Sequence, residues 1–191
     1  MTKVRLHPAL LEFRGAMKDM LFRQQNGKTI VSVKPNMSNV VPTPAQIAHR
    51  ERFSIAVAYG KTVMADPTIR ALYQQVAKER NMPLFAVTVA DFMNPPSVKE
   101  VDLSAYDGQV ANVIKVKVAD DFGVVNVHVT ITNTQYNEVI ESSNAVESGT
   151  GSGLWLYNAT TAVAPGTEVN VRVVATDRPG DTGFESQLKA L

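Results

Sequence analysis

The chain has 191 residues, enough for one large domain or two small ones, and its formal net charge at pH 7 is +1. It contains no cysteine, which excludes a disulfide framework, a thiolate metal site and a cysteine nucleophile. The sequence shows no apolar stretch long enough to cross a bilayer and no signal-peptide pattern at its start. We therefore expect a protein without membrane spans, located in the cytoplasm or in a virion.

The small net charge hides opposite charges in the two halves of the chain. Residues 1–93 contain 13 Lys and Arg against 6 Asp and Glu, whereas residues 94–191 contain 6 against 12. Three explanations stay open: an anionic partner of the first half, contact between the opposite ends of two copies, or attraction between two domains of one chain.

A β-hairpin is the first clear element along the chain. Asn26-Gly27 is the strongest short signal for a type I′ turn, and it separates the candidate strands 20–25 and 28–34. Two strands alone are marginally stable in water, so we expect this hairpin to pack against the helices, the second half or another copy. Residues 1–19 show no assignable pattern.

Two helices are predicted next, and each begins with a capping residue followed by proline. Thr43-Pro44-Ala45-Gln46 has the form of a capping box, and apolar residues follow it as far as Val63. Asp66-Pro67 starts the second helix, which is expected to end at Asn81. Residues 84–93 fit either a strand or a short helix, and we favour the helix.

A β-sandwich is predicted for the second half. Asn94-Pro95-Pro96 divides the chain into domains 1–93 and 94–191, because paired prolines end a helix and stiffen a linker. Beyond it, residues 113–118, 125–132 and 169–173 alternate apolar with polar side chains, as half-buried antiparallel strands do. Further strands are expected at 98–103, 139–140, 154–157 and 184–188. About seven strands in roughly 100 residues indicate a sandwich, so we expect an α+β protein.

Motifs of the second half resemble those of bacterial immunoglobulin-like modules. They are Asp121-Phe-Gly-Val-Val-Asn-Val-His-Val, Trp155-Leu-Tyr157, Pro165-Gly166 and Val171-Arg-Val-Val-Ala-Thr-Asp177. The resemblance implies a seven-stranded immunoglobulin-like sandwich with Trp155 in its core and without the cysteine pair of antibody domains. The hairpin and helices are similar to uncharacterised bacterial and phage proteins that place such a region before an immunoglobulin-like module. No catalytic residue or cofactor is implied by either resemblance.

Four aspartates are candidate ligands of a calcium ion. In such a sandwich, the loops after the first and third alternating runs emerge at the end where the chain enters. Two further interpretations stay open: the carboxylates accept hydrogen bonds within their own turns, or they contact the basic helical half. The four candidate ligands are Asp120, Asp121, Asp177 and Asp181.

Basic residues of the first half are the candidate interaction residues. A nucleic-acid site usually shows denser clusters with interleaved aromatic residues, so we favour an interface with acidic neighbours over a nucleic acid. Protein partners or self-association are therefore expected. The candidate residues are Arg14, Arg23, Lys28, Lys34, Arg50 and Arg52.

No catalytic constellation is recognisable in the sequence. The three histidines are far apart, no Gly-x-Ser-x-Gly motif occurs, and Gly149–Gly153 lacks the lysine of a phosphate loop. We therefore expect a non-catalytic structural or interaction protein without a cofactor, serving as a subunit of a virion-like or scaffold assembly. The alternatives are an enzyme, or a carbohydrate- or protein-binding module that uses sandwich loops or the aromatic pair Trp155 and Tyr157.

Overall fold

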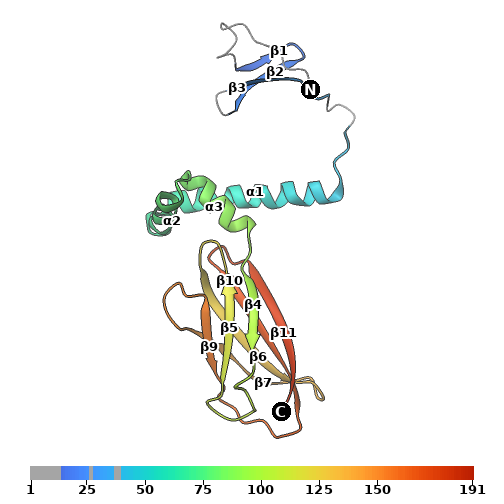
Figure 1. The fold of residues 1–191 in the computed structure, drawn as a ribbon, viewed down its shortest axis with the longest axis vertical. Coiled ribbons are helices and arrows are strands. Elements are labelled where there is room, and N and C mark those ends of the chain that lie inside the picture. Colours follow the sequence, from blue (N-terminus) through green and yellow to red (C-terminus); the bar gives the residue numbers. More distant parts are fainter. Residues whose placement is uncertain (1–13, 26–27, 37–39) are drawn as a thin grey trace. The chain divides into compact units, whose positions relative to one another are not determined.

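The computed structural model describes residues 14–25, 28–36 and 40–191 (Figure 1). The chain forms two compact units, which divide between Gln46 and Ile47. The first unit contains a three-stranded sheet, and the second contains three helices and a β-sandwich. The predicted division after residue 93 falls inside the second unit, and as a statement about domains it stays a prediction.

Three short antiparallel strands form the sheet of the first unit, in the order β1 (Gly15–Met17), β2 (Met20–Gln25) and β3 (Lys28–Val33). The predicted hairpin is confirmed, because β2 pairs with β3 and Gln25 lies opposite Lys28. Its turn at residues 26–27 lies outside the described residues. Three residues are too few to show alternation in a sequence, which explains why β1 is not predicted.

Helix α1 (Pro44–Ala65) begins at the predicted capping box. The backbone N–H of Gln46 donates to Thr43 Oγ1 at 3.3 Å, and the N–H of Thr43 donates to Gln46 Oε1 at 3.0 Å. These bonds satisfy donors that have no partner inside the helix. The helix continues through Gly60, where a Cβ atom would lie 2.9 Å from Phe85 and from Thr88. Glycine therefore allows the close approach of the helix that follows.

The two remaining helices also follow their predicted signals. Helix α2 (Pro67–Arg80) is capped by Asp66, whose Oδ1 accepts hydrogen bonds from the next N–H groups of the chain. It ends at Asn81, whose φ of 50° is in the left-handed region common at helix C-termini. Residues 84–93 form helix α3 (Leu84–Met93), as favoured from the sequence. Four buried residues hold the helices together: Val63, Tyr73, Ala77 and Val87.

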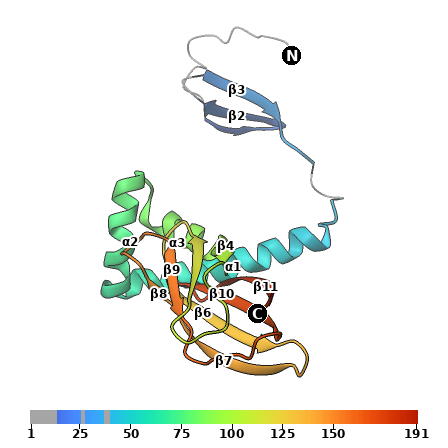
Figure 2. The same ribbon diagram turned by 60° about the horizontal axis from the view of Figure 1, so that its bottom comes forward.

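The rest of the second unit, which is described throughout, is an antiparallel β-sandwich of eight strands (Figure 2). One sheet has the strand order β4-β5-β9-β8, and the other has the order β11-β10-β6-β7. The predicted α+β class is confirmed, and the strand beyond the expected seven is the two-residue β8. The bounds are β4 (Ser97–Asp102), β5 (Val113–Ala119), β6 (Val124–Asn133), β7 (Glu138–Asn144), β8 (Val146–Glu147), β9 (Leu154–Asn158), β10 (Glu168–Asp177) and β11 (Thr182–Ala190).

Alternation along the strands builds the sandwich core. In β10, every second residue from Val169 to Ala175 is fully buried, and the same pattern occurs in β5 and β6. Trp155 and Tyr157 of β9 belong to the same core. On one side the edge strands β4 and β11 approach each other closely, since a Cβ atom at Gly183 would lie 1.9 Å from the carbonyl oxygen of Pro96. The two sheets therefore meet along this side.

Candidate interaction surfaces and the acidic end of the sandwich

One face of the three-stranded sheet is apolar. Directly opposite residues of an antiparallel sheet lie on the same face, and Met20 lies opposite both Met17 and Val33, while Phe22 lies opposite Val31. We call these five residues the apolar sheet face. Phe22 is 6% exposed, whereas the other four are between 41% and 75% exposed. Apolar area of this kind is removed from water when a partner packs on it.

The basic residues of the first unit lie on different parts of this sheet. Arg23 belongs to the opposite face of β2, because side chains alternate along a strand. Arg14 precedes β1 and donates to Gln24 Oε1 at 2.9 Å. Lys28 is the first residue of β3, and Lys34 follows its last residue.

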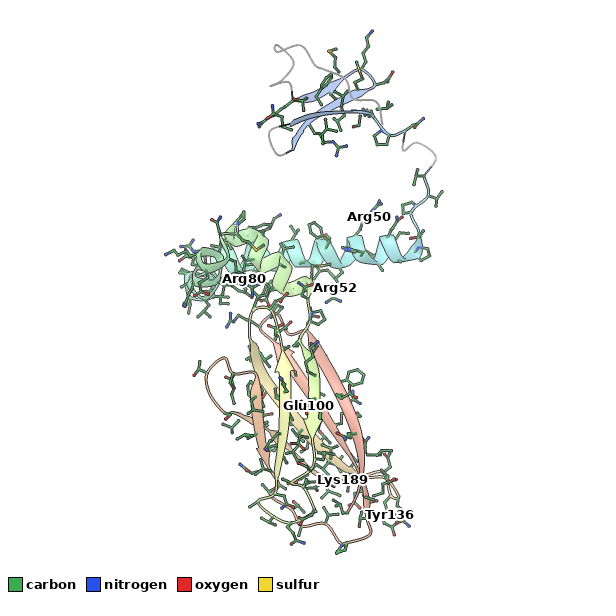
Figure 3. The ribbon with its side chains drawn as sticks, viewed as in Figure 1. Arg50, Arg52, Arg80, Glu100, Tyr136 and Lys189 are labelled. Atoms are coloured by element: carbon green, nitrogen blue, oxygen red, sulfur yellow. The ribbon has the colours of Figure 1, made fainter. Side chains whose placement is uncertain are left out.

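The start of α1 is a second exposed surface, which belongs to the second unit. Ile47, Phe53 and Ile55 are 45%, 49% and 58% exposed, and the first buried residue of the helix is Ala56. Arg50 is exposed in the same stretch (Figure 3). We call residues 47–55 the exposed segment of α1. About two turns of helix thus present large apolar side chains to water.

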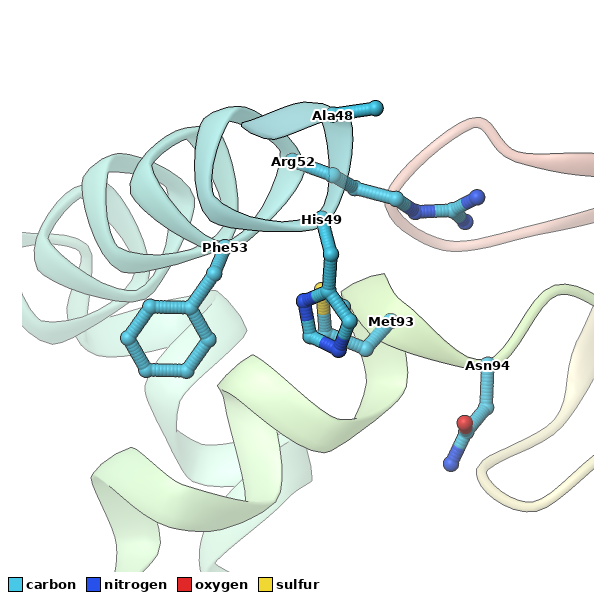
Figure 4. Close-up of a pocket in the computed structure, with 6 residues that line it drawn as sticks. All are labelled: Ala48, His49, Arg52, Phe53, Met93 and Asn94. Atoms are coloured by element: carbon cyan, nitrogen blue, oxygen red, sulfur yellow. The ribbon is translucent and has the colours of Figure 1, made fainter. Parts of the chain in front are cut away.

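An open hollow of about 670 Å³ lies beside this segment, between α1 and the end of α3. Figure 4 shows His49 and Phe53 extending from α1 on the side where Met93 of α3 lies. The exposed segment of α1 therefore borders a concave surface that both apolar and polar side chains line. Its lining residues are Ala48, His49, Arg52, Phe53, Met93 and Asn94.

Two of the four candidate aspartates connect the sandwich with the helices. Asp181 forms an ion pair with Arg52 at 3.2 Å, and Arg52 also donates to the carbonyl oxygen of Phe92 at 3.4 Å. Asp121 Oδ2 accepts a hydrogen bond from Asn94 Nδ2 at 3.2 Å. Arg52, predicted as an interaction residue, is thus engaged within its own unit.

Arg80 of α2 adds a further contact at this junction (Figure 3). It donates to the carbonyl oxygen of Asp121, and its guanidinium carbon lies 4.6 Å from the ring centroid of Phe122. A cation over an aromatic face is attracted by the electron density of the ring. The loop after β5 is therefore held against α2 by both its backbone and its side chain.

The other two candidate aspartates accept hydrogen bonds inside their own loops. Asp120 Oδ2 accepts from N–H groups two and three residues further on, at 2.9 and 2.6 Å. Asp177 Oδ1 accepts from N–H groups three and four residues further on, at 2.9 and 2.7 Å. Turn capping and contact with the helices are thus both observed. Within the described residues, no group of three or more His, Asp or Glu side chains is placed to hold a metal ion, and calcium binding stays a prediction.

Asp91 of α3 is a buried carboxylate at this junction that the sequence patterns do not single out. The hydroxyl of Tyr73 donates to its Oδ2, and the hydroxyl of Tyr59 lies 2.8 Å from that of Tyr73. Burial, with a smaller contribution from the negative charges of Asp120 and Asp177, raises the pKa of Asp91 to about 6. One signal could have revealed it, since Asp91 is the single charged residue in the apolar helix α3.

Asp177 and Arg178 complete the electrostatics of the junction. Burial raises the pKa of Asp177 to about 6 against the opposing effect of its two backbone hydrogen bonds. The guanidinium carbon of Arg178 lies 5.5 Å from the ring centroid of Tyr73, and its positive charge lowers the pKa of Asp91. The junction therefore holds several carboxylates, and the half-buried Arg178 balances part of their charge in addition to Arg52.

A further buried carboxylate, Glu141, lies inside the sandwich. Glu141 pairs with Ile131, but the next residue of β6 pairs with Val139, so β7 contains a bulge that turns Glu141 inward. Its Oε2 accepts hydrogen bonds from the N–H and the hydroxyl of Thr160. Burial, together with the charge of Glu141, raises the pKa of Tyr106 to about 12. This polar group is part of the core and is shut off from solvent.

The aromatic pair of β9 does not form a sugar-binding platform. Trp155 is 7% exposed and Tyr157 is 2% exposed, so neither ring can stack on a sugar at the surface. The version of the carbohydrate-binding hypothesis that depends on these two rings is therefore wrong. Residues 155 and 157 are two positions apart in a strand, so their side chains lie on the same face and can both be buried in the core.

Three titratable groups with raised pKa values do not line any of three hollows on the surface of the second unit. Asp91, Asp177 and Tyr73 are absent from the lining of the hollow at α1 and from those at the α2–α3 turn and beside β4.

None of the described helices is both long and apolar enough to span a membrane.

Comparisons with known proteins give little further information. No protein-family model matches the sequence, and no curated protein matches it. Among solved structures, the chain is similar to CopC from Methylosinus trichosporium OB3b, with 14% sequence identity and a TM-score of 0.37. The match covers 49% of this chain and 89% of CopC. Such a similarity assigns neither a family nor a function to this chain.

Proposed function

We propose that this protein is a non-catalytic subunit of a larger assembly, of a virion-like or scaffold type, whose copies associate through residues 14–55. The distribution of exposed apolar side chains carries the proposal. Of the 21 large hydrophobic residues that are exposed in the described part of the chain, 10 lie between Met17 and Ile55, about a fifth of its length. Such concentrations mark interaction sites rather than ordinary protein surface.

The size of the first unit supports a packing partner. Phe22, which is 6% exposed, is its one buried apolar residue within the described positions. Burial of apolar side chains among these described residues therefore contributes little free energy to the sheet. A second copy that covers the apolar sheet face supplies the missing burial.

The charges of the two units favour association between copies. Residues 1–46 contain 7 Lys and Arg against 2 Asp and Glu, whereas residues 47–191 contain 12 against 16. The first unit of one copy and the second unit of the next therefore carry opposite net charges and attract each other.

We further propose that the sandwich is an immunoglobulin-like module. In that fold, strands A, B, E and D form one sheet and G, F and C form the other. The orders β4-β5-β9-β8 and β11-β10-β6 follow this arrangement along the chain, with β7 as an added edge strand. In this proposal the module is a spacer or display element, and its location is the cytoplasm or a virion.

The placement of the titratable groups supports a role without catalysis. The carboxylates with raised pKa values are buried at the helix–sandwich junction, where hydrogen bonds and an arginine engage them. A general acid or base must reach a substrate, and such groups are normally found in a cleft.

A pair of phenylalanine variants tests the proposal. Phe53 and Phe184 are both exposed, but Phe53 belongs to the exposed segment of α1 and Phe184 to the sandwich. Sedimentation velocity should show that Phe53→Ser weakens self-association by roughly tenfold, the equivalent of about 1.4 kcal/mol. Phe184→Ser should leave it unchanged. Equal effects of the two substitutions would rule out association through residues 14–55.

A further inference from the structure

Tyr136 is an exposed aromatic residue on the turn that joins β6 to β7. Its side chain is 69% exposed. Asn133 Oδ1 accepts hydrogen bonds from the N–H groups of Gln135 and Tyr136, at 2.9 and 3.4 Å. The N–H and the hydroxyl of Thr134 both donate to the carbonyl oxygen of Glu168 at 3.0 Å. These bonds fix the backbone of the turn, which therefore presents the ring to water from an ordered position.

An aromatic side chain on an ordered turn is suited to enter a hollow on a partner. An aromatic ring buries about 150 to 250 Å² when it leaves water, and tyrosine is among the residues that contribute most to binding at interfaces. Because hydrogen bonds already order the turn, a contact with a partner costs little further conformational entropy. Among the aromatic residues in the described part of the chain, Tyr136 is the most exposed.

Tyr136 and the hollow beside α1 lie at opposite ends of the second unit. Figure 3 labels Arg52, which lines the hollow, at one end and Tyr136 at the other. Strand β6 begins next to the loop that contacts α2 and ends at Asn133, and its ten residues span roughly 33 Å. A copy therefore cannot place Tyr136 in its own hollow, whereas the turn of another copy can reach it.

We propose that the turn with Tyr136 of one copy occupies the hollow beside α1 of the next copy. This inference rests on the proposed function, because it names the surfaces through which the copies associate. In this arrangement the ring packs against Phe53 and Met93, which line the hollow. Aromatic rings pack favourably on one another and on the sulfur of methionine. The contact also covers part of the exposed segment of α1.

Charges on the two surfaces are complementary. Glu138 is exposed at the start of β7, two residues after Tyr136. On α1, Arg50 precedes Phe53 by three residues and therefore lies on the same face of the helix, whereas Glu51 lies about 160° away from Phe53. Among the described residues that line the hollow, none is acidic. The acidic side of the turn therefore faces Arg50 of the next copy.

The contact joins two different surfaces, so the copies are arranged head to tail. Each added copy again leaves one hollow and one turn exposed, and the same contact can repeat. Such an arrangement closes into a ring of fixed copy number when the rotation between neighbouring copies allows it.

Substitution of the tyrosine tests the contact. In the full chain, Tyr136→Ser should raise the dissociation constant of self-association by roughly tenfold or more in light scattering. Phe184→Ser is the matched control, because Phe184 is a 63% exposed aromatic residue of β11 that belongs to neither surface. The control should leave the dissociation constant unchanged.

A mixture of two variants tests the head-to-tail arrangement. Phe53→Ser alters the hollow and keeps the turn, whereas Tyr136→Ser alters the turn and keeps the hollow. At a concentration where each variant alone is monomeric, an equimolar mixture should form a pair with the dissociation constant of the unmodified contact. A contact in which the same surface of both copies meets itself would give no such recovery.

A charge reversal tests the orientation of the turn. Glu138→Lys should raise the dissociation constant by roughly threefold to tenfold, because it places two positive charges together. Glu185→Lys, at an exposed glutamate of β11, makes the same change in net charge and should have no effect. A chain with both Arg50→Glu and Glu138→Lys should recover the original association. Continued weak association of that chain would overturn the contact between these two side chains.

The outcomes separate this inference from the proposed function. Weaker association of Tyr136→Ser than of Phe184→Ser, together with pairing in the mixture, supports the head-to-tail contact. If the unmodified chain self-associates but the two serine variants behave alike, or the mixture stays monomeric, the contact is overturned and the assembly function survives. If the unmodified chain is a monomer at every concentration, both are overturned, and another protein becomes the candidate occupant of the hollow.

Discussion

The hydroxyl of Tyr73 in α2 donates a hydrogen bond to the buried carboxylate of Asp91 in α3, which joins two helices at the end of the sandwich. The hydroxyl of Tyr59 in α1 lies 2.8 Å from that of Tyr73, so the polar chain includes all three helices. Asp91 Oδ1 has no hydrogen-bond partner among the described residues. The bond from Tyr73 is therefore the principal polar contact of this carboxylate.

Removal of this bond should destabilise the second unit. Tyr73→Phe leaves both oxygens of Asp91 without the tyrosine donor, and hydrogen bonds to charged groups contribute about 1.5 to 3 kcal/mol. We expect urea denaturation to show a loss of about 2 kcal/mol in the free energy of unfolding. Tyr136→Phe, at an exposed tyrosine, is the control and should change it by less than about 0.5 kcal/mol. Losses of the same size in both variants would show that the bond has no special role.

The raised pKa of Asp91 predicts an unusual dependence of stability on pH. Its pKa is about 6 in the folded protein against 3.8 as the unperturbed value, so the folded state binds more protons between these two pH values. The free energy of unfolding should therefore rise as the pH falls from 7 to 5, by on the order of 1 kcal/mol from this group. Asp91→Asn removes the titration of this group and should reduce the rise, while Asp177, whose pKa is also raised to about 6, keeps its own contribution. Identical profiles for the two proteins between pH 7 and pH 5 would contradict the assignment.

The contact between β4 and β11 predicts a sensitive glycine. A Cβ atom at Gly183 would lie 1.9 Å from the carbonyl oxygen of Pro96, so Gly183→Ala must displace one of the two edge strands. We expect a loss of about 2 kcal/mol or more in the free energy of unfolding. Gly149→Ala is the matched control, because a Cβ atom there meets nothing within 4 Å. Equal stability of the two variants would mean that the strands do not meet at this point.

The ion pair of Arg52 with Asp181 should contribute little to stability. Both side chains are partly exposed, and pairs of this kind are typically worth less than about 1 kcal/mol. A double-mutant cycle with Arg52→Ala and Asp181→Ala should give a coupling energy of about 0.5 kcal/mol. A coupling energy above about 2 kcal/mol would instead show that this ion pair contributes strongly to holding α1 against the sandwich.

The elements of the fold were predictable wherever the signal is local. The caps at Thr43 and Asp66 act within one helical turn, and the Asn26-Gly27 signal depends on two adjacent residues. Alternation along β10 likewise requires only that one face of a strand be buried. All of these signals come from neighbouring residues. The structure has the two caps, the alternation in β10 and the pairing of β2 with β3 at the expected positions.

Features that depend on long-range contacts were not predictable in the same way. The role of Asp91 depends on Tyr73 in another helix, and Glu141 faces the core because of a bulge in the pairing of β6 with β7. Arg52 has the sequence character of a free surface residue, but its partner Asp181 is 129 residues further along the chain. Sequence patterns predict on which face of a helix or strand a residue lies. The contacts between distant elements decide which charged side chains are paired inside the protein and which can bind a partner.

The molar mass of the full chain in solution, measured by light scattering over a range of concentrations at low and high salt, tests the central claim most directly. We predict a discrete multiple of 20.8 kDa that persists at micromolar concentration, with a salt dependence if the opposite charges of the two units contribute. A mass of 20.8 kDa at every concentration and salt would contradict self-association through residues 14–55.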